Sequence, residues 1–298
     1  MGLLAGAGLK SYVDTHNSVP RNLDISAVVA LALPIDDYLK YGDHYRDIYE
    51  NHTHTMTINN FLTPVVVNIT FKGVITIAEG ASALYALRGV GTDLLGPVVD
   101  KLRDENPEVF ADITAADLAS AENIVGVDIG EGTVNLPVFT SGKFNADASR
   151  SHPQGYGNVL EGALESMHDA GIDMYSSRKE LSEFLRSEPT KLQRSRYNTV
   201  KSYVDEVAKF FADEVAQKFA SVMYAVGGIT EIVYIYGGGA APLKQWLEAA
   251  IISEINSVTG GNDIPVVYLD DDYYRNLNRE GLAVAAGGLA QMSQGNNG

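Results

Sequence analysis

The chain has 298 residues, of which 45% are hydrophobic, and its formal net charge is -16. This length and composition fit one large or two ordinary folded domains and exclude global disorder. The acidic balance argues against direct contact with nucleic-acid phosphates, although a basic adaptor protein would still allow indirect contact with DNA. The sequence contains no cysteine, which excludes disulfides and thiolate chemistry and fits the cytoplasm. No apolar run reaches membrane-spanning length, so we expect no membrane partner.

The first part of the sequence predicts a helix followed by strands. Residues 1–17 predict a short helix of small residues, and "ISAVVALALP" predicts a buried strand that ends at Pro34. A polar, tyrosine-rich segment then leads into "TPVVVNITFKGVITIAEG", whose β-branched residues predict one or two strands. "GASALYALRGVG" predicts a helix with Gly89 and Gly91 near its end, and residues 93–122 predict further helical pieces.

Strands and helices continue to alternate through the rest of the chain. "NIVGVDIGEGTVNLPVF" predicts two short strands joined by a glycine turn. Residues 198–225 carry apolar side chains at three- and four-residue steps, which predicts one long amphipathic helix. "EIVYIYGGGAAPLKQWLEAAIISEI" predicts a strand, a glycine turn and a helix, "IPVVYL" a strand, and "NREGLAVAAGGLAQM" a closing helix. The mixture predicts an α/β fold.

The first motif with chemical meaning is Asp-x-Gly-x-Gly-Thr, from Asp128 to Thr133. Gly130 and Gly132 let backbone N–H groups approach a phosphate closely, because no Cβ blocks the way. Thr133 adds a hydroxyl donor, and Asp128 at a strand end can hold Mg²⁺ through bound waters. A β-hairpin with a glycine turn and a turn aspartate explains the motif equally well.

The second motif is the run Gly237-Gly238-Gly239-Ala240 between a strand and a helix that starts near Pro242. Such a turn is a flat, open stretch of backbone that a planar purine or a phosphate can approach. The alternative is a tight strand–helix connection, which is less favourable because each glycine costs chain entropy on folding.

Glu79 lies at the predicted strand-to-helix junction of "ITIAEGASALYAL". A carboxylate there can orient an attacking water for phosphoryl transfer, although a glutamate stabilised by the helix dipole is the more frequent explanation. The histidines carry less information. His52 and His54 fit an exposed hairpin better than a metal site. His152 follows the second strand pair, where it could approach a nucleotide, although a loop histidine is the default explanation.

The order of these motifs is more specific than any one of them. A strand, Glu79 and a helix are followed by Asp-x-Gly-x-Gly-Thr, Gly157, a helical insertion, the triple-glycine turn and a closing helix. In this order the chain resembles the actin-like ATPase superfamily, and within it the ParM/StbA group of bacterial actins, which segregate plasmids. The resemblance covers roughly residues 20–290, and the two glycine motifs are its specific part. The segments that carry it are "VVALALPIDDYL", "ITFKGVITIAEGASALYAL", "VGVDIGEGTVNLPVF" and "VYIYGGGAAPL".

This resemblance implies two ribonuclease-H-like lobes around a nucleotide cleft. Residues 1–90, with a closing helix at 279–292, would form the first lobe. Residues 91–278 would form the second lobe, with a helical subdomain at about 160–226. The family's first lobe begins with a strand pair that carries its own Asp-x-Gly phosphate loop. No such loop precedes residue 20, so we expect an incomplete first lobe, either truncated or reduced.

The resemblance also implies a role for each motif residue. ATP or GTP would bind in the cleft with Mg²⁺, which Asp128 would hold through water, and Glu79 would position the hydrolytic water. Gly157 would border the cleft, and Lys201 or Glu206 on the long helix would approach the ribose. The other nucleotide-binding residues would be Gly130, Glu131, Gly132 and Thr133 at the phosphates, and Gly237, Gly238, Gly239 and Ala240 at the adenosine.

The implied function is a cytoplasmic, nucleotide-dependent filament that acts in plasmid DNA segregation. Its partners would be further copies of itself and a centromere-binding adaptor that links it to DNA. The family hydrolyses nucleoside triphosphates, but hydrolysis by this chain stays open, because one lost preorganised contact costs on the order of a hundredfold in rate. A non-polymerising phosphotransferase of the same fold and a degenerate, non-catalytic actin-like scaffold also stay open.

Overall fold

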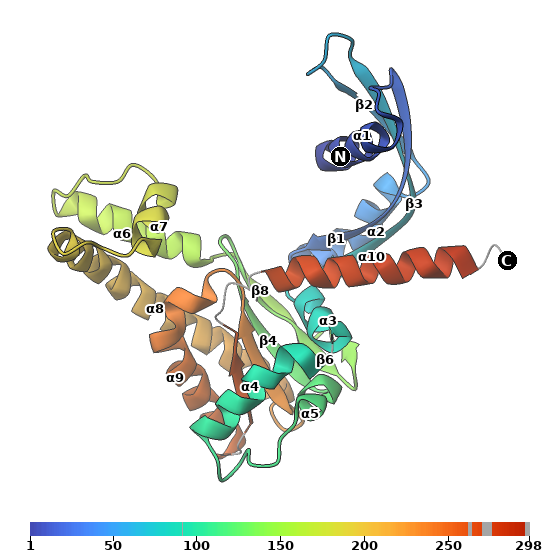
Figure 1. The fold of residues 1–298 in the computed structure, drawn as a ribbon. Helices are drawn as coiled ribbons and strands as arrows, with labels where there is room; N and C mark the ends of the chain where they lie inside the picture. Colours follow the sequence, from blue (N-terminus) through green and yellow to red (C-terminus); the bar gives the residue numbers. More distant parts are fainter. Residues whose placement is uncertain (91, 262–263, 270–275, 296–298) are drawn as a thin grey trace.

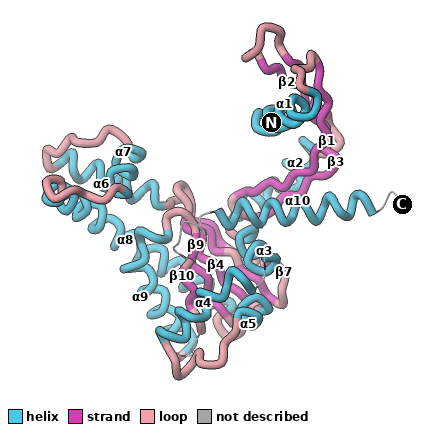
Figure 2. The backbone as a smooth tube through the Cα atoms, in the orientation of Figure 1, coloured by secondary structure: helices cyan, strands magenta, loops and turns pink. Residues whose placement is uncertain are grey.

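The computed structural model describes residues 1–90, 92–261, 264–269 and 276–295. It shows an elongated N-terminal part and a larger body, with the helix α10 (Leu277–Gly295) running from the body along the N-terminal part (Figure 1). Figure 2 shows the same arrangement by secondary structure, with the strands of the body enclosed between helices. Within the described ranges, no helix has the length and apolar character needed to cross a membrane.

The N-terminal part is built on a three-stranded sheet with the strand order β1-β3-β2. The strand β1 (Asn22–Leu33) runs parallel to β3 (Val65–Ala78), and β2 (Thr53–Ile58) pairs antiparallel with the first half of β3. The β-branched segment therefore forms one strand, where the sequence allowed one or two. The helix α1 (Gly2–His16) buries Ala5 and Leu9 in a cluster with the apolar side chains of β3.

A short, closely packed connection joins this sheet to the body. The helix α2 (Ile35–Tyr49) starts directly after Pro34, and β3 leads through Glu79 into α3 (Ala81–Val90). The helix α10 packs along α3 so closely that a Cβ at Gly281 would overlap the carbonyl oxygen of Ser82. Gly91, the second predicted helix stop, lies outside the described residues.

The body contains a seven-stranded sheet with β4 (Ile124–Ile129) at its centre. The strand β9 (Ile232–Tyr236) is parallel to β4, and β10 (Val266–Tyr268) is parallel to β9. Where the sequence predicts a single second strand, the structure has β5 (Val134–Leu136) and β6 (Val138–Thr140), because Pro137 lies between them and has no N–H for a ladder bond. The remaining strands are β7 (Lys143–Phe144) and β8 (Arg150–His152).

Helices cover both faces of this sheet. The long predicted helix is α8 (Arg194–Val226), and its apolar stripe is buried against α6 (Tyr156–Asp169) and α9 (Ala240–Thr259). The short helix α7 (Arg178–Arg186) lies with α6 near the N-terminal end of α8 (Figure 1). The helices α4 (Thr92–Glu105) and α5 (Ala115–Ser120) pack with α3 on the other face.

The architecture confirms the predicted α/β class. Two sheets are present, and a shared apolar cluster joins the end of the first sheet to one face of the second through Ile77, Leu84 and Tyr236. The closing helix of the sequence prediction corresponds to α10. The division into lobes at about residue 90 stays a prediction.

Candidate functional site

The side chain of Asp128 is buried near the C-terminal end of β4, where the residue is only 4% exposed. Its Oδ2 accepts a hydrogen bond of 2.7 Å from Nδ2 of Asn278, which lies in the first turn of α10. Burial raises the pKa of Asp128 to about 7, while the bond from Asn278 lowers it and the charge of Glu79 raises it. Because burial disfavours the negative charge of this carboxyl group, a nearby cation would stabilise its ionised form.

Asn278 also holds the junction that carries Glu79. Its Oδ1 accepts hydrogen bonds from the backbone N–H of Gly80, at 3.1 Å, and from the hydroxyl of Ser82, at 2.7 Å. The phenolic hydroxyl of Tyr236 donates to the carbonyl of Gly80 at 2.8 Å. Both backbone polar groups of Gly80, the residue after Glu79, are thus hydrogen-bonded by residues far away in the sequence.

Glu79 directly follows the last residue of β3, next to the body. Its N–H donates to the carbonyl of Leu33 at 2.7 Å, and its Oε2 accepts from Nδ2 of Asn135 at 3.4 Å. Partial burial raises the pKa of Glu79, the bond from Asn135 lowers it and the charge of Asp37 raises it. Asn135 is the partner of Asp128 in the β4–β5 ladder, so the residue that contacts Glu79 lies opposite Asp128.

The predicted phosphate loop is a tight turn between β4 and β5. The N–H of Gly130 donates to the carbonyl of Thr133 at 2.9 Å. No neighbouring atom lies within 4 Å of where a Cβ of Gly132 would be, so the outer side of the turn is open. The carbonyls of Gly130 and Glu131 accept from the N–H groups of Tyr156 and Gly157, at 2.9 and 2.8 Å, at the start of α6.

Gly157 has a steric reason to be glycine. A Cβ there would lie 2.8 Å from the carbonyl oxygen of Glu131 and 2.9 Å from Nη1 of Arg178. The start of α6 can therefore pack directly on the turn only if this position has no side chain. The predicted cleft residue and the predicted phosphate turn are in direct contact.

The triple-glycine turn lies on the same edge of the sheet. Gly237 has a φ of +100°, and its Cβ would lie 2.5 Å from Oδ1 of Asp128. The N–H of Gly239 donates to the carbonyl of Ile129 at 2.9 Å, and Ala240 begins α9. Because β4 and β9 are parallel neighbours, their C-terminal ends bring both glycine turns together, which is where open α/β sheets bind ligands.

A cavity of about 650 Å³ opens beside these turns. Glu131, Gly157, Gly238 and Gly239 form part of its wall. The other lining residues come mainly from the start of α6 and from α7, and the sequence analysis did not predict them. They are Tyr156, Leu160, Ser177, Arg178, Lys179, Ser182, Glu183 and Arg186.

The long helix contributes less to this cavity than the sequence led us to expect. Neither Lys201 nor Glu206 lines it, and Nζ of Lys201 forms an ion pair with Asp205 at 2.6 Å. The cationic groups that face the cavity belong to α7 instead. No glycine motif marks α7, so the only local signal was its cluster of arginine and lysine residues.

The default expectation of a loop position for His152 is wrong, because His152 ends β8 and pairs with Val134, directly after the first glycine turn. Nε2 of His152 lies 3.2 Å from a carboxylate oxygen of Glu214, and the ring of His54 packs against Tyr49 and Phe71. Within the ranges that the structure describes, no group of three or more His, Asp or Glu side chains is close enough to hold a metal ion. A Mg²⁺ ion at Asp128 would consequently depend on water and phosphate for its other ligands.

No protein-family model and no curated protein matches this sequence. Solved structures do match. The chain is similar to the actin-like protein Alp7A, with a TM-score of 0.63 and 17% identity over 99% of this chain and 75% of that one. An archaeal actin homolog, Ta0583, in complex with ADP gives a TM-score of 0.55 and 13% identity over 89% of this chain and 72% of that one. Bacillus thuringiensis ParM with ATP gives a TM-score of 0.53 and 12% identity over 95% of this chain and 73% of that one. The chain therefore has an actin-like fold, as the resemblance implied.

Proposed function

We propose that this chain is a nucleotide-binding actin homologue that assembles into filaments and acts in plasmid DNA segregation. The observation that carries the proposal is the meeting of two glycine turns, the start of α6 and the carboxyl groups of Asp128 and Glu79 at one edge of the sheet. ParM and Alp7A are among the structural neighbours, and one neighbour is a ParM with ATP and another an actin homolog with ADP.

The nucleotide would lie across both glycine turns. The open outer side of the turn at Gly132 suits the phosphates, because backbone N–H groups there can be approached without obstruction. The cavity between Gly238, Gly239 and α7 suits the base and ribose. Arg178 and Lys179 place positive charge at a site that must hold a polyanion, although Arg178 lies 3.8 Å from Glu161 and Lys179 lies 3.9 Å from Glu183.

Asp128 fits a role at the metal ion. Mg²⁺, when bound with the nucleotide, would supply the positive charge that neutralises the phosphates. The buried carboxyl group of Asp128 would hold that ion through water, and the hydrogen bond from Asn278 fixes the orientation of this carboxyl group. A purely structural buried aspartate would need more hydrogen-bond donors than the one amide that the described residues offer it, in order to offset the cost of burial.

Glu79 is the group we propose to orient the water that attacks the terminal phosphate. Its pKa is raised by burial, which makes it a stronger base than an exposed glutamate. The fixed peptide at Gly80 and the amide of Asn135 hold it in place. Within the described residues, the N-terminal sheet contributes Glu79 to the site but no glycine loop. We therefore propose that this polypeptide hydrolyses nucleotide slowly, at a rate on the order of a hundredfold below that of a site with two phosphate loops.

Nucleotide binding can be tested at Gly132. Gly132→Asp adds a negative charge in open space, so the protein should fold while binding of a fluorescent ATP or GTP analogue with Mg²⁺ weakens strongly. Gly287→Asp, on an open part of α10, adds the same charge away from the site and should bind like the wild type. Equal affinity in all three proteins would contradict the placement of the phosphates.

The link to plasmid DNA would run through a basic adaptor, because the chain itself carries a net charge of -16. Electrophoretic mobility shift with plasmid DNA should show no complex with this protein alone at about 0.15 M salt. A shift that depends on this protein alone would refute the indirect link.

A further inference from the structure

An exposed leucine is presented at the turn between α7 and α8. Leu192 is 97% exposed. The turn around it is closed, because Oε1 of Gln193 accepts from the N–H and the hydroxyl of Thr190 at 3.1 and 3.0 Å, and the N–H of Gln193 donates to the carbonyl of Thr190 at 3.0 Å. Leu192 is therefore held outward by a defined backbone and not by a loose chain.

Basic side chains surround this leucine. Lys191 and Arg194 flank it and have no ion-pair partner among the residues described by the structure. Arg196 packs over the rings of Tyr175 and Phe184. In a chain with a net charge of -16, an apolar side chain between unpaired cations is a distinctive surface, which we call the Leu192 knob.

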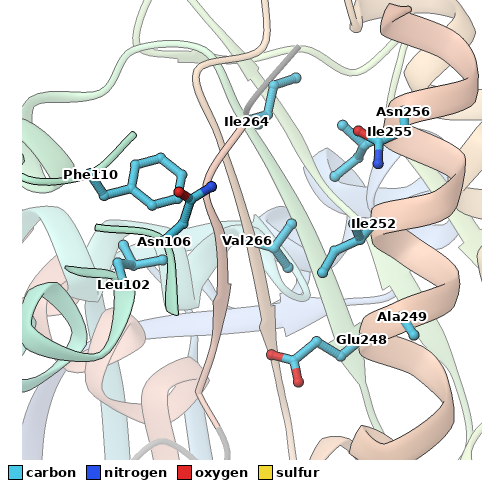
Figure 3. A pocket seen from close by; sticks show the side chains of 10 residues that line it. All are labelled: Leu102, Asn106, Phe110, Glu248, Ala249, Ile252, Ile255, Asn256, Ile264 and Val266. Carbon is cyan, nitrogen blue, oxygen red and sulfur yellow. The ribbon is translucent and has the colours of Figure 1, made fainter. Parts of the chain in front are cut away.

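A second apolar feature lies at the other end of the body. It is a cavity of about 430 Å³ between α9, β10 and the loop that follows α4, and we call it the socket. Figure 3 shows Val266 on its floor between Phe110 and Ile252. The apolar lining consists mainly of Leu102, Phe110, Ile252, Ile255, Ile264 and Val266.

The segments that form the socket are predominantly acidic, opposite in sign to the knob. Glu248 lines the socket directly. Between residues 100 and 112, the acidic Asp100, Asp104, Glu108 and Asp112 are exposed. The basic residues of that segment are Lys101 and Arg103, both partly buried, and Arg103 donates to the carbonyl of Ile113.

The knob and the socket lie at opposite ends of α8. The knob immediately precedes Arg194, the first residue of α8. At the other end, a Cβ on Gly227 would lie 3.3 Å from Cγ1 of Val258, in the last turns of α9, which also carry Ile255 and Asn256. Because α8 has 33 residues, the two features are separated by about 50 Å. A molecule of this length cannot fill its own socket, whereas another copy can.

We propose that the Leu192 knob of one copy docks into the socket of the next copy. The contact joins two different surfaces, so it repeats head to tail, and such an interface gives an open filament when its rotation does not close a ring. The apolar side chain supplies the anchor, and the opposite charges around knob and socket orient the approach. This inference rests on the proposed filament function, for which it names the longitudinal contact.

Two single variants test the two halves of the contact. Leu192→Asp disables the knob, and Ile252→Asp, at a position 42% exposed, disables the socket without disturbing the buried core. Each should raise the protein concentration needed for assembly about tenfold or more. Leu62→Asp, at a fully exposed leucine on the β2–β3 turn, is the control and should assemble like the wild type. Circular dichroism should show the same fold in all four proteins.

Mixing the two variants gives the sharper result. Leu192→Asp keeps its socket and Ile252→Asp keeps its knob, so an equimolar mixture has one working contact per pair. Sedimentation velocity should show dimers that do not grow, where each variant alone stays monomeric.

The outcomes separate this contact from the wider function. Assembly of both variants at the wild-type concentration, or a mixture without dimers, would overturn the knob-and-socket contact and leave nucleotide-dependent assembly standing. A wild type that fails to assemble with any nucleotide would overturn both. Loss of assembly in the Leu62 control as well would show that the effect is not specific to the knob, and would also overturn the contact.

Discussion

Replacing Asp128 with asparagine should make the protein more stable at neutral and alkaline pH. The folded protein raises the pKa of this carboxyl group from 3.8 to about 7. The folded state then holds its proton more tightly than the unfolded state, so stability falls as pH rises from 3.8 and levels off above about 7. The shift corresponds to about 4 kcal/mol of lost stability, which is the most that Asp128→Asn can restore. The substitution keeps the shape of the side chain, and the asparagine carbonyl can still accept the hydrogen bond from Asn278.

The assay is urea denaturation of wild type and variant between pH 5.5 and 8.5, in a chelator and without nucleotide. The free energy of unfolding of the variant should exceed that of the wild type by a margin that grows by about 2 kcal/mol between pH 5.5 and 8.5, mostly below pH 7. Asp147→Asn removes an exposed carboxylate and serves as the matched control. A margin independent of pH, or a variant less stable than the wild type at pH 8, would refute the reasoning.

Three further substitutions test the framework around the site. Asn278→Ala leaves Asp128 and the N–H of Gly80 without their amide partner, so it should lower the free energy of unfolding by about 1–3 kcal/mol in urea denaturation; an unchanged value would contradict the contacts. Gly281→Ala should separate α10 from α3 and lower the melting temperature in a thermal scan, while Gly287→Ala, in open space, should not. Thr114→Ala removes the capping box of α5 and should cost about 1 kcal/mol in urea denaturation, with no loss of nucleotide binding.

Sequence reasoning works well where the structural cause is local. The turn from Asp128 to Thr133 is closed by a bond within the motif itself, between Gly130 and Thr133, so its glycine pattern was sufficient to predict it. The apolar stripe of α8 is likewise a local periodicity. The order of such local motifs along the chain was enough to predict the actin-like fold.

Contacts between distant residues were beyond the sequence. Asn278 reaches Asp128 across 150 positions, and nothing in the closing helix marks an asparagine as a partner of the site. Arg178 and Lys179 face the cavity only because α7 folds back over the start of α6. Lys201 was suggested as a contact for the ribose, but its ammonium group forms an ion pair with Asp205 one helical turn away. The helical spacing of the sequence did not show which of these two partners Lys201 would have.

High-speed sedimentation with Mg-ATP, Mg-GTP, Mg-ADP and no nucleotide tests the central claim most directly, with electron microscopy of the pellets. We predict filaments in a pellet that forms with a nucleoside triphosphate and is much smaller with Mg-ADP or without nucleotide. Pellets of equal size in all four conditions, or no pellet in any of them, would contradict a nucleotide-dependent filament.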